Sequence, residues 1–362
     1  MASTSPLPSG SPDIAAEVQH ALTAFLDVQA VRLRAIGPEL AAQVDAARDA
    51  TSGGKRLRPA FCYWGFRAAG GDDAQPILRA AASLEMLHVS ALVHDDVMDA
   101  SDVRRGVPSA HRRFESIQRA APSSAAGADA ERFGTGAAIL LGDLCLVWAD
   151  ELLHTSGFDV AALGRAASYF DAVRLEVIAG QYLDLVAQAS GEPDMDRALR
   201  VLRFKSAKYT VERPLHIGAA LAGGSQELVD SLSSYGLPVG EAFQLRDDLL
   251  GVFGDPAVTG KPAGDDLREG KRTVLTAYAV DHASEVQLEI FDKLFGRPDL
   301  DDDEIQLLRE ILVDSRAVQA CEDLIAARTG EATDALAGAP FADESARTAL
   351  ADLAVAATVR TL

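Results

Sequence analysis

Apolar residues recur every three or four positions along most of the chain, which is the spacing of amphipathic helices. Ala, Leu, Arg, Glu and Gln dominate, and runs that alternate β-branched and polar residues are hard to find. Breakers rich in glycine and proline divide the chain into stretches of helical length. The pattern therefore predicts an all-α fold. Residues 1–13 are rich in Ser and Pro and are predicted to be a disordered tail.

The composition is that of a globular protein with a large core, because 48% of the 362 residues are hydrophobic and 24% are charged. A formal net charge of −20 argues against a nucleic-acid partner, since phosphate backbones are bound by clustered Lys and Arg. The three cysteines lie far apart, which disfavours a zinc site. The most apolar stretch, 137–153, is interrupted by glycine and acidic residues. We therefore expect a cytoplasmic protein without a membrane span.

Two Asp–Asp pairs stand in apolar, helical surroundings. In the first, Asp95 and Asp99 are four residues apart and share one helix face. The second pair is Asp247 and Asp248, and the position four residues after Asp247 is Gly251. Acidic residues on helices are usually solvated, but like charges on an apolar face need a counter-charge, and hard divalent cations provide one. Two such faces would hold a metal–diphosphate cluster between them.

Short cationic clusters adjoin the acidic pairs. A glycine-rich turn at 53–59 carries three cations, Arg104 and Arg105 follow the first pair, and further lysines lie at 205–208 and in the segment 251–270. That segment holds four glycines and two prolines and is predicted to be an irregular loop. In a chain with a charge of −20, these clusters are better explained as anion-binding groups than as random surface charge. By contrast, the acidic run 301–304 is predicted to cap the helix that follows it.

Five motifs in this order resemble the trans-type polyprenyl diphosphate synthases, the family of farnesyl and geranylgeranyl diphosphate synthases. They are GGKRLRP, HDDVMDASDVRRG, GQYLDL, KSAKYT and FQLRDDLLGVFGDPAVTGKPAGDDLREGKRT, which together span 53–273. The resemblance implies one domain over residues 14–362, an isoprenoid-synthase-type helical bundle around a deep central cavity. It replaces the expectation of two domains that the length alone favours. It also implies a homodimer.

The family's reaction joins an allylic diphosphate to isopentenyl diphosphate. The resemblance implies three Mg²⁺ ions bound by Asp95, Asp99 and Asp247. It assigns the chemistry to these metal ligands together with Asp96, Arg104, Lys205 and Asp248. It assigns substrate contacts to Lys55, Arg58, His88, Arg104, Arg105, Gln181, Asp184, Lys205, Ser206, Gln244, Lys261 and Lys271.

Small residues precede the first acidic motif. Ser90 and Ala91 lie one helical turn before Asp95, where bulky aromatic residues stop chain growth at farnesyl in this family. Because Ser90 and Ala91 are small, the residue that blocks further growth of the chain is expected deeper in the cavity, at Leu87 or Leu84. This predicts geranylgeranyl diphosphate as the product, with farnesyl or a longer polyprenyl diphosphate as alternatives.

Two other functions are alternatives that the sequence disfavours. A class I terpene cyclase shares the first acidic motif and the fold, but it would carry an Asn/Ser/Glu motif instead of Asp247 and Asp248 and would not need an isopentenyl diphosphate site. A non-catalytic subunit of a heteromeric prenyl synthase would have lost acidic ligands, whereas Asp95, Asp99 and Asp247 are all present here. Gly251 is the one departure that keeps this second alternative open.

Overall fold

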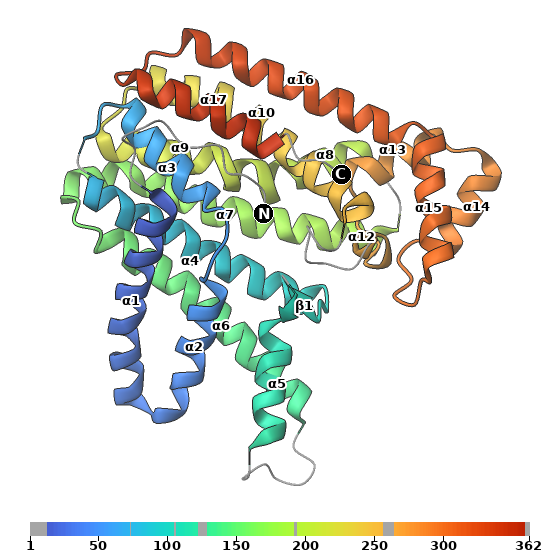
Figure 1. The fold of residues 1–362 in the computed structure, drawn as a ribbon, viewed down its shortest axis with the longest axis horizontal. Helices are drawn as coiled ribbons and strands as arrows, with labels where there is room; N and C mark the ends of the chain where they lie inside the picture. The colour runs from blue at the N-terminus through green and yellow to red at the C-terminus, as the bar shows by residue number, and fades with distance from the viewer. Residues whose placement is uncertain are drawn as a thin grey trace. The chain divides into compact units, whose positions relative to one another are not determined.

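The computed structural model describes residues 13–72, 74–104, 106–121, 129–191, 194–255 and 264–358. Apart from one short two-stranded ribbon, every regular element of these residues is helical (Figure 1). The prediction of an all-α fold is therefore confirmed. Arg105 and Lys261 lie outside the described residues, as do residues 1–12 of the predicted tail.

The elements follow one another with short connections. In the first half of the chain they are α1 (Ile14–Ile36), η1 (Pro38–Leu40), α2 (Ala41–Ala50), α3 (Leu57–Ala68), α4 (Ala74–Met98), β1 (Val103–Arg104), β2 (Val107–Pro108), α5 (Ala110–Ala120), α6 (Ala130–His154) and α7 (Val160–Ser190). In the second half they are α8 (Met195–Val201), the π-helix η2 (Leu202–Glu212), α9 (Arg213–Ala222), α10 (Gln226–Phe253), α12 (Asp265–Arg268), α13 (Val274–His282), α14 (Glu285–Leu294), α15 (Asp302–Asp314), α16 (Ala317–Gly338) and α17 (Glu344–Thr358).

The contacts divide the chain into two compact units. Unit 1 holds the described residues within Met1–Phe170, Pro214–Ser225 and Phe341–Ala349, and unit 2 holds those within Asp171–Arg213, Gln226–Pro340 and Leu350–Leu362. The prediction of a single domain over residues 14–362 is not tested by this division and stays a prediction.

Helix α4 is the centre of unit 1, where it packs along α6 and against α3 (Figure 1). Its apolar residues, among them Leu84 and Met86, are fully buried. Residues Gln75–Met98 are long and apolar enough to cross a bilayer, with a mean hydropathy of 1.3, but 72% of that window is buried inside the protein. The core position of α4 therefore explains its composition without a membrane.

Helix α10 is the centre of unit 2, where it packs against α16 and η2. Leu245, Leu249 and Val252 of α10 join one buried cluster with residues of α13 to α16. The helix continues through Gly251 to Phe253, and α12 is also helical, so the prediction of an irregular loop over 251–270 is wrong for these residues. Residues 256–263 of that segment lie outside the described part of the chain. A glycine inside a helix costs about 1 kcal/mol, and the burial of Leu250 and Val252 on either side of Gly251 offsets that cost.

The cap predicted for the acidic run 301–304 is confirmed. Asp301 is the N-cap of α15, and its side chain accepts a hydrogen bond from the Glu304 amide at 2.8 Å. Glu304 returns the contact by accepting from the Asp301 amide at 3.1 Å, which completes a capping box.

Candidate functional site

The first acidic motif lies at the carboxyl end of α4. The Asp99 amide donates to the Asp95 carbonyl at 2.8 Å, so helical spacing extends to Asp99 although the helix itself ends at Met98. Asp96 is buried, and Asp95 and Asp99 are half-buried. Carboxylates are disfavoured at a helix carboxyl end, where the free carbonyls already create a negative potential. This arrangement therefore favours a bound cation.

Arg104 of β1 reaches this motif. Its Nε lies 2.7 Å from Asp96 Oδ1, and its Nη2 lies 2.5 Å from the same atom and 3.8 Å from Asp95 Oδ2. The structure thus brings Arg104 to the carboxylates that the sequence predicts beside it.

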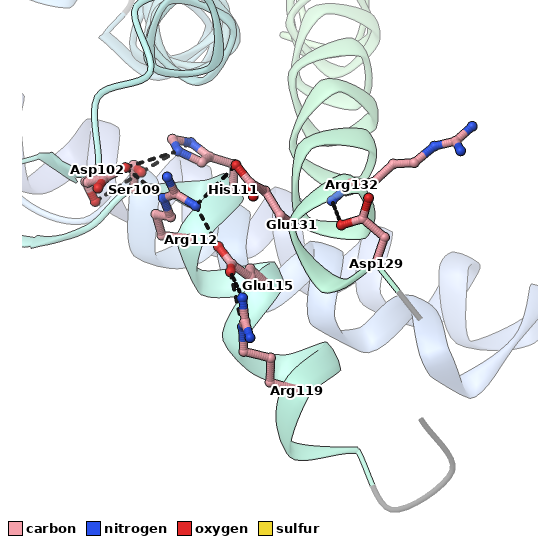
Figure 2. Close-up of polar contacts among 9 residues, drawn as sticks. All are labelled: Asp102, Ser109, His111, Arg112, Glu115, Arg119, Asp129, Glu131 and Arg132. Carbon is pink, nitrogen blue, oxygen red and sulfur yellow. Dashed lines mark hydrogen bonds and ion pairs between the residues drawn. The ribbon is translucent and has the colours of Figure 1, made fainter. Parts of the chain in front are cut away.

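A polar network fixes the base of the ribbon that carries Arg104 (Figure 2). The Ser109 amide and hydroxyl both donate to the Asp102 carbonyl, at 2.9 and 3.1 Å. Arg112 of α5 donates from Nε to Asp102 Oδ1 at 2.6 Å and from Nη1 to Glu115 Oε2 at 2.7 Å. Asp102 therefore connects the ribbon to α5, and none of these four residues was among the predicted site residues.

The three cations of the glycine-rich turn before α3 differ in burial. Arg56 is 5% exposed, pairs with Glu85 of α4 at 2.5 Å and donates to Gln19 of α1 at 2.6 Å. It therefore ties the turn to two helices. Lys55 is exposed, and Arg58 is half-buried, as is His88 of α4. These three residues belong to unit 1, and their assignment to one diphosphate stays a prediction.

The second acidic motif lies in the last turns of α10. Asp247 is exposed, whereas Asp248 is 8% exposed and accepts a hydrogen bond from Gln244 Nε2 at 2.7 Å. Burial raises the pKa of Asp248 to about 8; the negative charges of Asp266 and Asp247 act in the same direction, and the Gln244 bond and Lys271 oppose them. Burial thus favours the protonated form of Asp248, whereas Asp247 is exposed to solvent.

Asp266 of α12 lies beside the second acidic motif and was not among the predicted site residues. Its carboxylate lies against Gly251, so a Cβ at that position would stand 1.9 Å from Asp266 Oδ2. Lys271 Nζ lies 3.3 Å from Asp266 Oδ1 and 2.8 Å from Glu269 Oε2, which brings the predicted Lys271 to this acidic group. The adjacent acids 265 and 266 were visible in the sequence, but the pattern does not tell which of them turns toward α10.

The two middle motifs meet between α7 and η2. Lys205 Nζ of η2 lies 2.6 Å from Asp184 Oδ2 of α7, so two predicted residues form an ion pair. Gln181 precedes Asp184 on α7, Ser206 follows Lys205 on η2, and both are half-buried. Glu176, one turn before Gly180 on α7, binds Lys208 at 3.0 Å and was not predicted.

Within the described residues, no three His, Cys, Asp or Glu side chains converge as a metal cage. This observation fits Mg²⁺, which uses one or two carboxylates together with water and substrate phosphates rather than a full protein cage. The oxygen donors of both acidic motifs therefore suit a metal that is completed by a phosphorylated ligand. Ser90 and Leu87, predicted to line the product chain, are buried, as is Leu84, whereas Ala91 is half-buried.

Comparisons with known proteins agree on one family. The family model described as polyprenyl synthetase matches residues 43–312. A geranylfarnesyl diphosphate synthase of Aeropyrum pernix is 34% identical over 82% of this chain and 87% of its own length. A geranylgeranyl diphosphate synthase of Saccharolobus solfataricus is 30% identical over 84% of this chain and 86% of its own.

Solved structures give the same result. The geranylgeranyl pyrophosphate synthase of Corynebacterium glutamicum, in complex with isoprenyl diphosphate and magnesium, matches with a TM-score of 0.91 and 41% identity, over 96% of this chain and 99% of that one. A polyprenyl synthase of Caulobacter crescentus, in complex with calcium and isoprenyl diphosphate, matches with a TM-score of 0.76 and 29% identity, over 98% of this chain and 100% of that one.

Proposed function

Because the chain belongs to the polyprenyl synthetase family and is a trans-prenyltransferase, we propose that it joins an allylic diphosphate to isopentenyl diphosphate in a Mg²⁺-dependent reaction. The observation that carries the proposal is the first acidic motif, where Arg104 is held against carboxylates at the end of α4. The likeness to the Corynebacterium enzyme, whose structure contains isoprenyl diphosphate and magnesium, supports both the substrate class and the metal.

The reaction would begin when the allylic C–O bond breaks and the diphosphate leaves with the electron pair. Asp95, Asp99 and Asp247 would hold three Mg²⁺ ions, and these would supply positive charge that offsets the charge of the leaving diphosphate. The protein's own contribution is fixed positive charge and the exclusion of water from the allylic cation. The cations proposed to contact this diphosphate are Arg104, Lys205, Lys261 and Lys271.

The double bond of isopentenyl diphosphate would then attack the allylic cation and form the new C–C bond. Loss of one proton to the departed diphosphate restores an alkene, so charge and atoms balance without a nucleophilic side chain. Ser206, Gln244 and the Lys205 carbonyl would direct their dipoles toward the cation. The residues proposed to hold the diphosphate that does not leave are Lys55, Arg58, His88 and Arg105.

We propose geranylgeranyl diphosphate as the product, since small residues at 90 and 91 leave room beyond farnesyl. One specific observation favours a longer chain as the second candidate, because the Aeropyrum relative is a geranylfarnesyl diphosphate synthase. A cytoplasmic location stays a prediction.

A homodimer is supported by apolar residues that two helices leave exposed. On α6, Phe133, Leu140 and Val147 recur every seven residues and are 47%, 59% and 63% exposed. On α7, Leu175 and Tyr182 are likewise seven residues apart and are 70% and 67% exposed. Regular stripes of this kind are typical of surfaces that another protein covers.

The test is incubation of the purified protein with isopentenyl diphosphate, Mg²⁺ and each allylic primer in turn, followed by sizing of the product. We expect a C20 product that disappears on chelation. Asp95→Asn and Asp247→Asn should each lower turnover by orders of magnitude and leave the helical circular dichroism unchanged. Release of a cyclic hydrocarbon, or near-normal turnover in either variant, would contradict the proposal.

A further inference from the structure

One face of α7 contacts η2 through three residues spaced one helical turn apart, Glu176, Gly180 and Asp184. Glu176 accepts two hydrogen bonds from Arg213, from Nε at 2.7 Å and from Nη2 at 2.7 Å, and one from Lys208 at 3.0 Å. Asp184 accepts from Lys205 at 2.6 Å. The two acids therefore bind cations of η2 and of the residue after it, and Gly180 lies between them.

Gly180 touches the backbone of η2 directly. A Cβ at this position would stand 2.3 Å from the Lys205 amide nitrogen, 2.6 Å from Lys205 Cα and 2.7 Å from the Phe204 carbonyl carbon. Real Cβ atoms essentially never come this close to an atom to which they are not bonded. The neighbours here are backbone atoms, which cannot rotate aside. Any side chain at 180 would therefore displace the segment that begins at Phe204.

A second glycine, Gly240 of α10, makes the same kind of contact with the next part of η2. A Cβ there would stand 2.5 Å from the Ala207 carbonyl oxygen and 2.6 Å from Ala207 Cα. The backbone on both sides of Lys205 and Ser206 is therefore in direct contact with a neighbouring helix.

Because η2 is a π-helix, these backbone contacts bear on where its side chains lie. A π-helix has wider turns than an α-helix, is rare, and usually occurs as a single turn at a functional site. Here it extends over Leu202–Glu212 and includes both Lys205 and Ser206. A shift of η2 by even part of a turn would move both side chains.

We propose that Gly180 is the positioning residue of Lys205. The backbone contact with α7 fixes where the Lys205 side chain begins, and Asp184, one turn further along α7, fixes where it ends. Glu176 supports the same register of η2 through Lys208 and Arg213. The inference rests on the proposed function, since it takes Lys205 to bind the allylic diphosphate.

A double-mutant cycle tests whether Gly180 acts through Lys205. Turnover and the two Michaelis constants are measured for Gly180→Ala, Lys205→Ala and the double variant. A misplacement of about 1 Å costs on the order of 100-fold in rate, and we expect a fall of that size in kcat for Gly180→Ala, with an unchanged KM for isopentenyl diphosphate. Because the two residues act as one unit, the double variant should be no slower than Lys205→Ala alone.

Gly164→Ala is the matched control, because it changes the same helix at a position where an added Cβ meets nothing within 4 Å. It should keep the wild-type turnover. Hydrogen exchange gives a readout independent of activity: amides of 202–212 should exchange faster in Gly180→Ala and at the wild-type rate in Gly164→Ala.

If Gly180→Ala does not fold, Glu176→Gln tests the same idea. This variant keeps the glycine contact and the side-chain volume but loses the charge that faces Lys208 and Arg213. It should lower kcat less than the glycine variant, and the loss should vanish in the Lys205→Ala background.

The outcomes separate the two proposals. Normal turnover in Lys205→Ala would overturn both the proposed role of Lys205 and this inference. A slow Lys205→Ala together with a normal Gly180→Ala would overturn the inference alone. Effects of the two changes that multiply in the double variant would also overturn it, because Gly180 would then act through another part of the protein.

Discussion

At the scale of single residues, Gly251 has a steric role that its place in a helix does not suggest. Gly→Ala at an open helix position stabilises by about 1 kcal/mol, but at 251 the new Cβ would stand 1.9 Å from Asp266 Oδ2. The atoms it would meet all belong to the Asp266 side chain, which can turn aside, so we expect Gly251→Ala to lose this gain and to lower the free energy of unfolding by about 1 kcal/mol. Urea unfolding measures the change.

Gly330→Ala on α16 is the control, because nothing lies within 4 Å of the added Cβ, and it should stabilise the protein. The contact with Asp266 can be tested directly by repeating Gly251→Ala in an Asp266→Gly background, where the cost should largely disappear. An equal cost in the two backgrounds would show that the contact is not the cause.

The burial of His111 predicts that the folded protein loses stability in acid. Its ring is 7% exposed inside the network of Figure 2, with Nδ1 3.2 Å from Ser109 Oγ. Burial, and then the charge of Arg112, hold its pKa below the ordinary 6.5, although Asp102 and Asp96 act in the opposite direction. The unfolded chain therefore binds this proton at a higher pH than the folded protein does, and stability falls as the pH drops below about 6.5.

The variant His111→Gln cannot titrate. Its free energy of unfolding should therefore fall less than that of the wild type between about pH 7.5 and about pH 5. Urea titrations at several pH values give both slopes. Parallel slopes would refute the assignment of this loss to His111.

At the scale of elements, the local pattern predicted the helices but not their irregularities. The cap at Asp301 was predictable because a capping box is contained within four consecutive residues. The π-helix η2 was not, because its residues include good α-helix formers. Its position depends on Gly180 and Gly240, which come from other helices, and no window along the sequence contains all three.

Helix α4 allows a prediction on product length. Ser90 and Ala91 lie one turn before Asp95, and each further turn toward Leu87 and Leu84 adds about 5.4 Å of depth. Ala91→Phe should therefore shorten the product without abolishing ionisation at Asp95, and chromatography of the products measures the chain length. Ser90→Phe should act in the same direction, although Ser90 is buried and the larger ring will also strain the core.

Arg79→Phe is the control, since Arg79 is exposed near the other end of α4, and it should leave the product unchanged. A wild type whose product is farnesyl diphosphate, or Phe variants whose products both keep the wild-type length, would show that α4 does not limit the length of the product chain.

At the scale of the whole molecule, the order of the motifs was enough to predict the family, and the family model confirms it over residues 43–312. The partners of the charged residues were not predictable. Arg246 stands beside Asp247 in the sequence, yet it is buried, pairs with Glu322 of α16 at 2.6 Å and donates to the Thr358 carbonyl at 3.0 Å. Only the tertiary fold decides which of two neighbouring charges is structural and which faces the site.

The proposed homodimer gives the last prediction. In a twofold interface each residue occurs twice, so a new carboxylate in the α6 stripe meets the same surface of the partner and adds two buried charges. Leu140→Glu together with Val147→Glu should therefore convert the dimer into a monomer of 38.2 kDa, measured by light scattering after size exclusion. Val286→Glu on α14, at a valine that is 67% exposed, is the matched control and should stay dimeric. A wild type of single-chain mass, or a dimeric double variant, would exclude this face as the interface.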